Sequence, residues 1–372
     1  MSPAMPSLGD VCQFIRNGKS VTQSKEKDGL PITRIETIAD HSINESRVGY
    51  AGLSVDDAGD YLLEDGDILF SHINSLDHLG KVAIYEGTPA RLVHGMNLLN
   101  LRPDTAKVTS SYLLHALRAP TTRADLLRIS NKSVNQASIS VGNLKKVRIP
   151  VPELAEQRHI AAILGKADAL RAKRREAIAK LDQLLQSVFF DMFGDPIQNT
   201  KKIDTTPLGG LIALRTGKLD ANASSEDGQY PFFTCAREPL RISNYSYDCE
   251  CVLVAGNGDL NVKKYSGKFD AYQRTYILES LNKDILSTNY LFHFLDSYLD
   301  ELRKQSIGGI IKYIKKGNLT EAAIPLPSLQ KQTEFNRICD VISVQRHRLE
   351  GANAQIDHIF ASLQHRAFSG TL

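Results

Sequence analysis

The chain has 372 residues, enough for two or three domains that each bury an apolar core. Hydrophobic residues make up 42% and charged residues 23%, which excludes a disordered chain and a collagen-like one. The net charge is only +3 and no segment is a basic block, so binding to any polyanion by charge alone is disfavoured. No apolar run approaches the ~18 residues of a membrane helix. With no leader-like N-terminus and five scattered cysteines, we expect a cytoplasmic protein with free thiols.

Residues 1–150 are predicted to form a first α+β domain. Strand-like runs at 67–71, 81–85 and 98–101 are separated by Gly, Asn and Pro turns, and a short helix is expected at 111–119. The alternating strand–helix order of a nucleotide-binding sheet is missing.

A long helix is predicted over residues 151–195. Two columns of residues repeat at heptad spacing: Ile160, Ala167, Arg174, Leu181 and Val188, and three residues further on Ile163, Leu170, Ala177, Leu184 and Asp191. Such stripes over nearly five heptads are typical of a coiled coil. Pro152 suits a first helical turn, while Gly194 and Pro196 predict the stop. At 1.5 Å per residue this helix is about 60 Å long.

Residues 196–325 are predicted to form a second α+β domain, with strands at 251–255 and 275–278 and helical structure at 288–304. A second long helix follows over 326–372. Its columns read Phe335, Ile342, Leu349, Ile356 and Leu363, then Ile338, Gln345, Ala352, Ile359 and Arg366. The first column is apolar throughout, as the seam of a coiled coil requires.

An internal repeat relates the two halves. The pattern I-P-x-P-x-L-x-x-Q occurs at 149–157 and again at 324–332, an offset of 175 residues, and the same offset matches 142–144 with 317–319. We therefore expect two copies of one unit, with the two helices packed as an antiparallel coiled coil around an internal pseudo-two-fold axis. The alternative is that each helix packs separately on its own domain.

Catalytic motifs are missing from the sequence. It contains no G-x-x-x-x-G-K-[ST], H-E-x-x-H, C-x-x-C, G-x-S-x-G or N/D-P-P-Y/F motif. Cys249 and Cys251 are interpreted as strand thiols, and Gly256-Asn257-Gly258 as a turn. These absences favour a binding or scaffolding protein over an enzyme and predict no metal site.

Two diverged globular copies, each followed by I-P-x-P-x-L-x-x-Q and a long helix, resemble the specificity (HsdS-type) subunit of type I restriction–modification systems. Residues 149–160 are similar to that family's central region, and residues 181–195 also fit it. The second helix departs from the first: Thr333 and Glu334 occupy the places of Arg158 and His159, and Gln364 that of Phe189.

The resemblance implies a non-catalytic subunit of a host-defence complex. Two target recognition domains (1–150 and 196–325) would each read one half of a bipartite, asymmetric DNA site. The central spacer helix (151–195) and the C-terminal spacer helix (326–372) would set the spacer and dock two copies of an adenine methyltransferase subunit. No cofactor is expected in this chain: S-adenosylmethionine, ATP and Mg²⁺ would serve the modification and restriction/translocase partners, where adenine methylation and DNA cleavage reside.

Candidate residues follow from the chemistry of readout, in which Arg and Lys suit guanine and phosphate while Asn and Gln suit adenine. The predicted DNA-binding residues are Lys19, His72, Asn74, Lys81, Arg91, Lys132, Asn135, Gln136, Lys218, Asn257, Lys263, Lys264, Gln273, Arg274, Lys312 and Lys315. The predicted partner-docking and coiled-coil residues are Leu154, Gln157, Ile160, Ile163, Leu170, Leu181, Leu184, Val188, Phe193, Leu329, Gln332, Phe335, Ile338, Ile342, Leu349, Ile356, Ile359 and Leu363.

Two other functions stay open at this point. A coiled-coil adaptor that bridges two protein ligands would share the helices but would not touch DNA. A disguised methyltransferase is disfavoured by the missing motif. The cluster at 171–175 is interpreted as a solvated helix face, with a direct DNA contact as the alternative.

Overall fold

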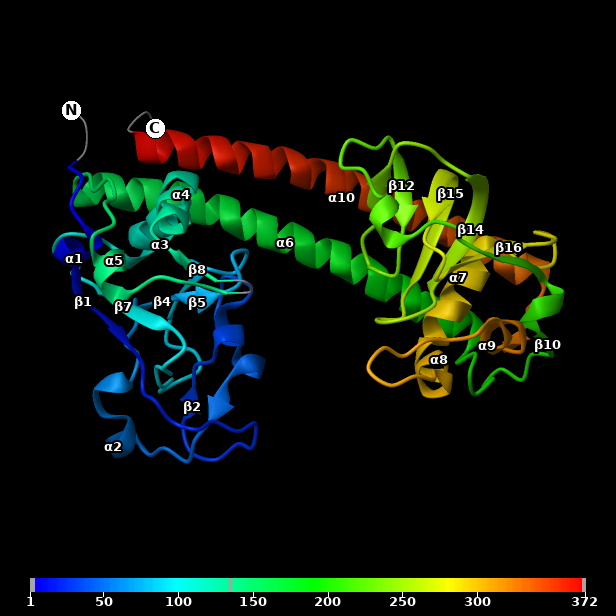
Figure 1. Cartoon of the computed structure of the whole chain (residues 1–372), viewed down its shortest axis with the longest axis horizontal. Coiled ribbons are helices and arrows are strands. Elements are labelled where there is room, and N and C mark those ends of the chain that lie inside the picture. Colours follow the sequence, from blue (N-terminus) through cyan, green and yellow to red (C-terminus); the bar gives the residue numbers. More distant parts are fainter. Residues whose placement is uncertain (1–3, 134–135, 370–372) are drawn as a thin grey trace. The chain divides into compact units, whose positions relative to one another are not determined.

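The computed structural model of the chain describes residues 4–133 and 136–369. It divides into two compact units: unit 1 contains Met1–Arg174 and Ala352–Leu372, and unit 2 contains Arg175–Gly351. Each unit combines sheets and short helices with one part of each long helix (Figure 1). The tandem α+β organisation predicted from the sequence is confirmed, and the unit boundaries fall inside the two long helices.

Unit 1 is built on a four-stranded antiparallel sheet. Its strands, in spatial order, are β1 (Cys12–Asn17), β7 (Leu99–Pro103), β4 (Ile68–Phe70) and β6 (Val82–Ile84). Ile68 and Phe70 of β4 join the core that includes α3 (Ser110–Arg118), whereas Leu69 joins a second apolar cluster. Successive side chains of a strand point to opposite faces, so β4 is buried on both sides. The three strands and the helix predicted here are confirmed within two residues.

The smaller elements of unit 1 lie around this sheet. They are α1 (Leu8–Val11), β2 (Pro31–Ile32), η1 (Ile35–Ile38), η2 (Glu45–Arg47), β3 (Gly49–Tyr50), α2 (Val55–Ala58), η3 (Gly59–Tyr61), β5 (Ile73–Asn74), α4 (Pro120–Arg128), β8 (Asn131–Lys132), β9 (Ala137–Ser138) and α5 (Val141–Lys145). Strands β5, β9 and β8 form a separate three-stranded sheet, and β2 pairs with β3.

Unit 2 is built on a six-stranded sheet. In spatial order its strands are β11 (Ile212–Thr216), β16 (Thr275–Ser280), β14 (Tyr247–Ala255), β15 (Val262–Ala271), β12 (Tyr230–Phe233) and β13 (Leu240–Ile242). Val252 and Val254 enter the core beneath α7 (Thr288–Ser297), whereas Cys251 and Leu253 enter a second cluster on the other face. Cys251 is completely buried, in line with the prediction of a strand thiol, and the five cysteines are free.

The other elements of unit 2 flank the sheet. They are β10 (Thr205–Pro207), η4 (Leu208–Gly210), η5 (Ala221–Ala223), α8 (Leu299–Gln305), α9 (Lys316–Thr320) and β17 (Ala323–Pro325), with β10 paired to β17. The helical segment predicted at 288–304 is divided into α7 and α8, which meet at Tyr298, where φ is −82° and ψ is −4°.

The two long helices are α6 (Leu154–Phe193) and α10 (Leu329–Ser369), within three residues of the predicted bounds. In unit 2 they run antiparallel: Phe193 packs edge-on against Phe335, with ring centroids 5.4 Å apart, and Asp182 pairs with Arg346. In unit 1 the other ends pack together, and Ile160 shares a core with Phe360 and Ala367. The alternative of separately packed helices is wrong.

Only one of the two predicted heptad columns forms the seam. Ile160, Phe335 and Ile342 are buried, whereas Leu170 and Ile359 of the other column are exposed. Each helix also packs against its own α/β modules, so the buried stripe turns toward them and leaves the second column partly uncovered.

One ion pair occurs twice between the long helices. In unit 1 Arg171 Nε lies 2.5 Å from an Asp357 carboxylate oxygen, and in unit 2 Arg346 Nη1 lies 2.7 Å from an Asp182 oxygen. The offset of 175 residues turns one pair into the other, since it maps Arg171 onto Arg346 and Asp182 onto Asp357. The internal repeat therefore extends to individual contacts.

The glutamine that closes each I-P-x-P-x-L-x-x-Q motif is a buried clamp. Gln157 accepts a hydrogen bond from the Thr109 N–H and donates to the carbonyls of Lys107 and Pro152, all at 2.9 Å. Gln332 accepts from Ser287 and donates to Ile285 and Pro327 at 2.9–3.0 Å. In both units the amide thus ties the start of a long helix to the start of α3 or α7.

Candidate nucleic-acid interface

In unit 1 a hairpin and a neighbouring strand form a small polar platform. Strands β8 and β9 form the hairpin, and β9 pairs on its other edge with β5, so that Asn74 lies opposite Ala137. Lys132 and Gln136 are exposed on this hairpin. Four of the predicted positions, His72, Asn74, Lys132 and Gln136, therefore come together. The fifth, Asn135, lies outside the described residues.

Unit 2 builds the same platform from equivalent residues. Ile307 and Tyr313 bridge to close a hairpin, and Asn257 bridges to Tyr313 on its other side. The Ile314 N–H donates to the Gly256 carbonyl, just as the Ile139 N–H donates to the His72 carbonyl in unit 1. We call residues 72–74 with 131–133 and 136–138 the first platform, and residues 256–258 with 307–314 the second.

The two platforms differ at the tip of the hairpin. At the repeat offset of 175, Asn135 and Gln136 correspond to Ile310 and Ile311. In the first copy the described residue Gln136 is polar and exposed, whereas the second copy carries two exposed apolar side chains, Ile310 and Ile311, followed by Lys312. The scaffold is repeated while the groups that a ligand would meet are changed.

Further predicted residues gather around the second platform. The Gly256 N–H donates to the Arg274 carbonyl, and the Gln273 N–H donates to the Leu219 carbonyl, so two more turns join the same end of the sheet. Gln273, Arg274 and Lys218 are exposed there. Lys315 is the N-terminal residue bordering α9, where its side chain is also exposed.

Beside the first platform lies a pocket of about 200 Å³. Asn74 and Lys81 line it together with Ser71, His78 and Glu36. The Lys81 ammonium donates to the Ala39 carbonyl at 2.7 Å, which fixes the lysine at the rim. His72 is buried, and burial lowers its pKa, so this imidazole is neutral at pH 7 and supports the platform from beneath.

Other predicted residues are engaged elsewhere. Lys19 donates to the Asp57 carbonyl at 2.5 Å and approaches the Tyr61 ring. The ammonium is therefore engaged within unit 1, and these contacts do not support its predicted role as a phosphate clamp. Lys264 contacts Asn289 on α7, because alternate residues of β15 face the helices. Lys263 contacts Asn261, and burial lowers the pKa of Lys263. Arg91 is exposed and has a left-handed backbone conformation, φ 56°.

Sequence reasoning missed a basic groove in unit 1. An open groove of about 860 Å³ is lined by Lys25, Lys27, Arg34 and Arg47 together with Glu36 and Glu45. Both arginines are ion-paired, Arg34 with Glu36 and Arg47 with Asp40, and Glu36 also lines the pocket beside the first platform. These cations are scattered among acidic residues along the chain, so no basic run marks them in the sequence. Positive side chains in a concave surface suit the phosphates of a duplex.

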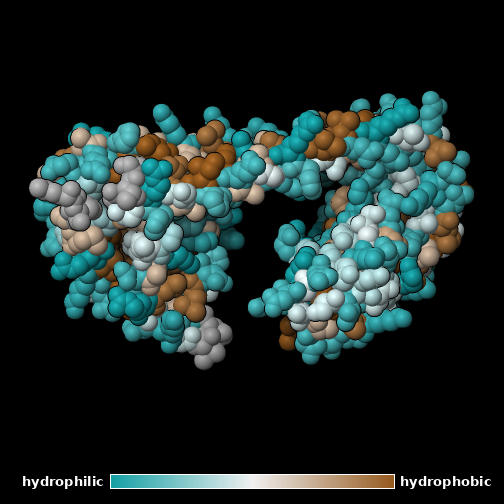
Figure 2. Space-filling model, turned by 90° about the horizontal axis from the view of Figure 1, so that it is seen from above, coloured by the Kyte–Doolittle hydropathy of each residue, from teal (hydrophilic) through white to brown (hydrophobic). Residues whose placement is uncertain are grey.

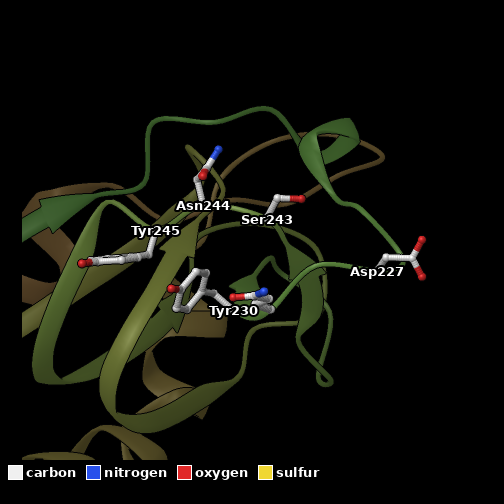
Figure 3. A pocket seen from close by; sticks show the side chains of 6 residues that line it. Asp227, Tyr230, Ser243, Asn244 and Tyr245 are labelled. Carbon is white, nitrogen blue, oxygen red and sulfur yellow. The ribbon is translucent and has the colours of Figure 1, made fainter.

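Unit 2 has a different pocket at the β12–β13 edge. Its volume is about 320 Å³, and Asp227, Gln229, Ser243 and Asn244 line it beside two tyrosines (Figure 3). The rings of Tyr230 and Tyr245 are 4.9 Å apart, and the Lys268 ammonium lies 4.8 Å from the Tyr245 ring. None of these residues is predicted from the sequence.

The predicted helix-surface residues divide by exposure. Exposed ones are Leu170, Leu184, Leu329 and Ile359; half-buried ones are Leu154, Ile163, Leu181, Val188, Ile338, Leu349, Ile356 and Leu363; buried ones are Gln157, Ile160, Phe193, Gln332, Phe335 and Ile342. The buried group belongs to the units' own cores and offers no docking surface. Val341 and Val344 are exposed as well and were missed because they lie outside both heptad columns. On the face shown in Figure 2, hydrophobic residues form separate patches among hydrophilic ones.

Within residues 4–133 and 136–369, no helix combines the length and apolarity needed to cross a bilayer. The same residues hold no group of three or more His, Cys, Asp or Glu side chains arranged for a metal ion.

Two copies of one α+β module, each with a platform of short strands and bridges, together with two antiparallel long helices define a class of tandem-repeat recognition proteins. Comparison with known proteins gives the family. The model of the type I restriction modification DNA specificity domain matches residues 4–180 and 200–355. The putative type I restriction enzyme MjaX specificity subunit of Methanocaldococcus jannaschii is 32% identical over 92% of this chain and 88% of its own. The EcoDI specificity subunit of Escherichia coli is 42% identical over 42% of this chain and 34% of its own.

Solved structures agree in fold. The S subunit of the type I restriction–modification system of M. genitalium has a TM-score of 0.59 at 14% identity, covering 99% of both chains. A chain from a study of complex assembly in a type I system has a TM-score of 0.54 at 16% identity, covering 100% of this chain and 98% of that one. The protein therefore belongs to the family of type I restriction–modification specificity subunits, and the resemblance seen in the sequence is confirmed.

Proposed function

We propose that this chain is the non-catalytic subunit that selects the DNA site for a type I restriction–modification complex, and that each unit reads one half of a bipartite, asymmetric sequence. The observation that carries the proposal is the repeated platform, which exposes Lys132 and Gln136 in unit 1 but Ile310, Ile311 and Lys312 in unit 2. Two copies of one scaffold that present different side chains suit two different half-sites. The basic groove of unit 1 supplies phosphate contacts, which position a protein on the duplex without reading its sequence.

The long helices serve as spacer and docking surface in this proposal. Two copies of an adenine methyltransferase subunit bind along them, one for each copy of the repeat, and a restriction/translocase subunit joins the complex. S-adenosylmethionine, ATP and Mg²⁺ act in those partners. The exposed residues Leu170, Leu184, Val341, Val344 and Ile359 supply apolar area for such contacts.

Selection from randomised duplexes tests the function. The chain in complex with its modification subunits is expected to enrich two short defined half-sites separated by a fixed unspecified spacer. Specific DNA binding typically exceeds nonspecific binding by about 10³–10⁷-fold at physiological salt, so enrichment is readily measured by sequencing. Capture of unrelated proteins by both units with no enriched sequence would instead establish the adaptor function.

Exchange of one domain tests whether the half-sites are read independently. Replacing residues 204–323 with the matching segment of another specificity subunit should change one half-site and leave the other intact. Strand β10 pairs with β17, so both edges of this segment are held together in unit 2. The same duplex selection measures the outcome, and a change in both half-sites would contradict independent readout.

A further inference from the structure

The tip of the second platform exposes two isoleucines. The exposed fraction of Ile310 is 105% and that of Ile311 is 63%. Burial away from water stabilises such apolar side chains, and neither residue is buried within the unit. The base of the hairpin is nevertheless fixed, by the Ile307–Tyr313 bridge and by the bond from the Gly258 N–H to the Lys312 carbonyl at 3.0 Å. A fixed hairpin therefore holds an apolar tip in solvent.

The surroundings of the tip indicate what covers it. Lys312, Lys315 and Lys316 follow it in sequence and are exposed, and the Arg274 turn is hydrogen-bonded to the same platform. An apolar tip surrounded by cationic side chains suits a ligand that presents negative charges and apolar groups side by side. The major groove of duplex DNA is such a surface, because each thymine presents a methyl group between phosphate backbones.

The repeat supplies an independent argument. Ile310 and Ile311 correspond to Asn135 and Gln136 at the offset of 175 residues. Asn and Gln are the side chains that pair with the adenine edge in the major groove, whereas apolar side chains contact the thymine methyl there. In sequence, the positions matched by the repeat thus carry two alternative kinds of major-groove reader in the two copies.

We infer that Ile310 and Ile311 read thymine by apolar contact with its 5-methyl group in the half-site that unit 2 recognises. This inference rests on the proposed function and adds to it which base the second unit prefers and which atoms do the reading. Thymine and uracil pair identically and differ only by that methyl, so exchanging them isolates the contact.

The test uses the complete complex with modification subunits and two duplexes of the selected sequence, one with uracil in place of the thymines of the unit 2 half-site. For the wild-type protein we expect about a fourfold loss of affinity per contacted methyl, equivalent to about 0.8 kcal/mol. The variant Ile310→Ser with Ile311→Ser should show that loss on the thymine duplex and become indifferent to uracil. Leu281→Ser is the matched control, since Leu281 lies in the same unit with the same exposed fraction of 63%.

The outcomes separate this inference from the proposed function. A wild-type complex that selects no sequence overturns both. A complex that selects a sequence but is insensitive to uracil, or a half-site made only of G·C pairs, overturns the inference alone. A double serine variant that keeps the full response to uracil also overturns the inference. A double serine variant that loses its modification subunits while its discrimination between bases is unchanged overturns it as well, because the tip would then contact a protein.

Discussion

Replacing Gln157 with Met is expected to destabilise unit 1 by about 3–5 kcal/mol. The side chain is completely buried, and its amide satisfies one backbone N–H and two carbonyls. Methionine matches its length but makes none of these bonds, and each buried polar group left unpaired costs roughly 1–3 kcal/mol. Since a domain is stable by only about 5–15 kcal/mol, the loss is a large share of the total. Urea unfolding of the full chain, monitored by circular dichroism, measures this loss of stability. We expect a lower urea midpoint for one of two transitions, the one that corresponds to unit 1.

Gln332→Met should have the same effect on unit 2, because its three hydrogen bonds repeat those of Gln157. Gln183→Met and Gln345→Met are matched controls on the same two helices, where both glutamines are exposed. The controls should unfold like the wild type. If Gln157→Met also unfolded at the wild-type midpoint, the clamp would contribute nothing and its place in the motif would need another explanation.

Inserting four residues after Ala172 is expected to abolish selection of the normal spaced site while each half-site sequence remains readable. Arg171 and Asp182 are eleven residues apart on α6, and Arg346 and Asp357 are eleven apart on α10. Both ion pairs form only if these intervals match. Four helical residues add about 6 Å to one interval and shift the apolar column out of register.

The expected loss of selection follows from the changed register between α6 and α10 and not from the energy of the two ion pairs. The paired side chains are partly exposed, and such pairs contribute only about 0.2–1 kcal/mol each. They are more valuable as markers of alignment, since an apolar column alone would accept a slip by a heptad. The substitution Arg171→Gln, which removes one pair without changing length, should leave the selected spacer unchanged.

A compensating insertion makes the test sharper. Four further residues after His347 lengthen the interval on α10 by the same amount, so both ion pairs can form again. The double insertion should restore selection, with a spacer longer by about two base pairs at ~3.4 Å per pair. Duplex selection with each complex measures the spacer directly. An unchanged spacer in the single or the double insertion would show that the helices do not set it.

The long helices and the repeat could be predicted because their signals are local and redundant. The heptad columns and the I-P-x-P-x-L-x-x-Q motif placed both helices within three residues. The platforms could not be predicted in the same way. Strands β5, β8 and β9 are two residues long, too short for an alternating pattern, and β5 pairs with β9 between residues more than 60 positions apart. Composition indicated the polar residues but not which of them meet.

The burial of individual cations was equally invisible in the sequence. Lys263 and Lys264 are adjacent and look alike, yet alternation along β15 sends one toward Asn261 and the other toward α7. The basic groove shows the opposite case, in which Lys25, Arg34 and Arg47 are far from any basic run but line one concave surface. The number of charged residues in a stretch of sequence therefore does not show how many charged side chains the fold brings together on one surface.

The division of α10 between the two units has a consequence for synthesis on the ribosome. Unit 1 contains the first half of the chain and also residues from 352 onward, and its core includes Phe360 and Ala367. Translation proceeds at about 5–20 residues per second, so the apolar face around Ile160 stays uncovered for about 10–40 s after it leaves the ribosome. The domain made first is completed last, and during that interval the part of its core that Phe360 and Ala367 cover stays exposed on the nascent chain.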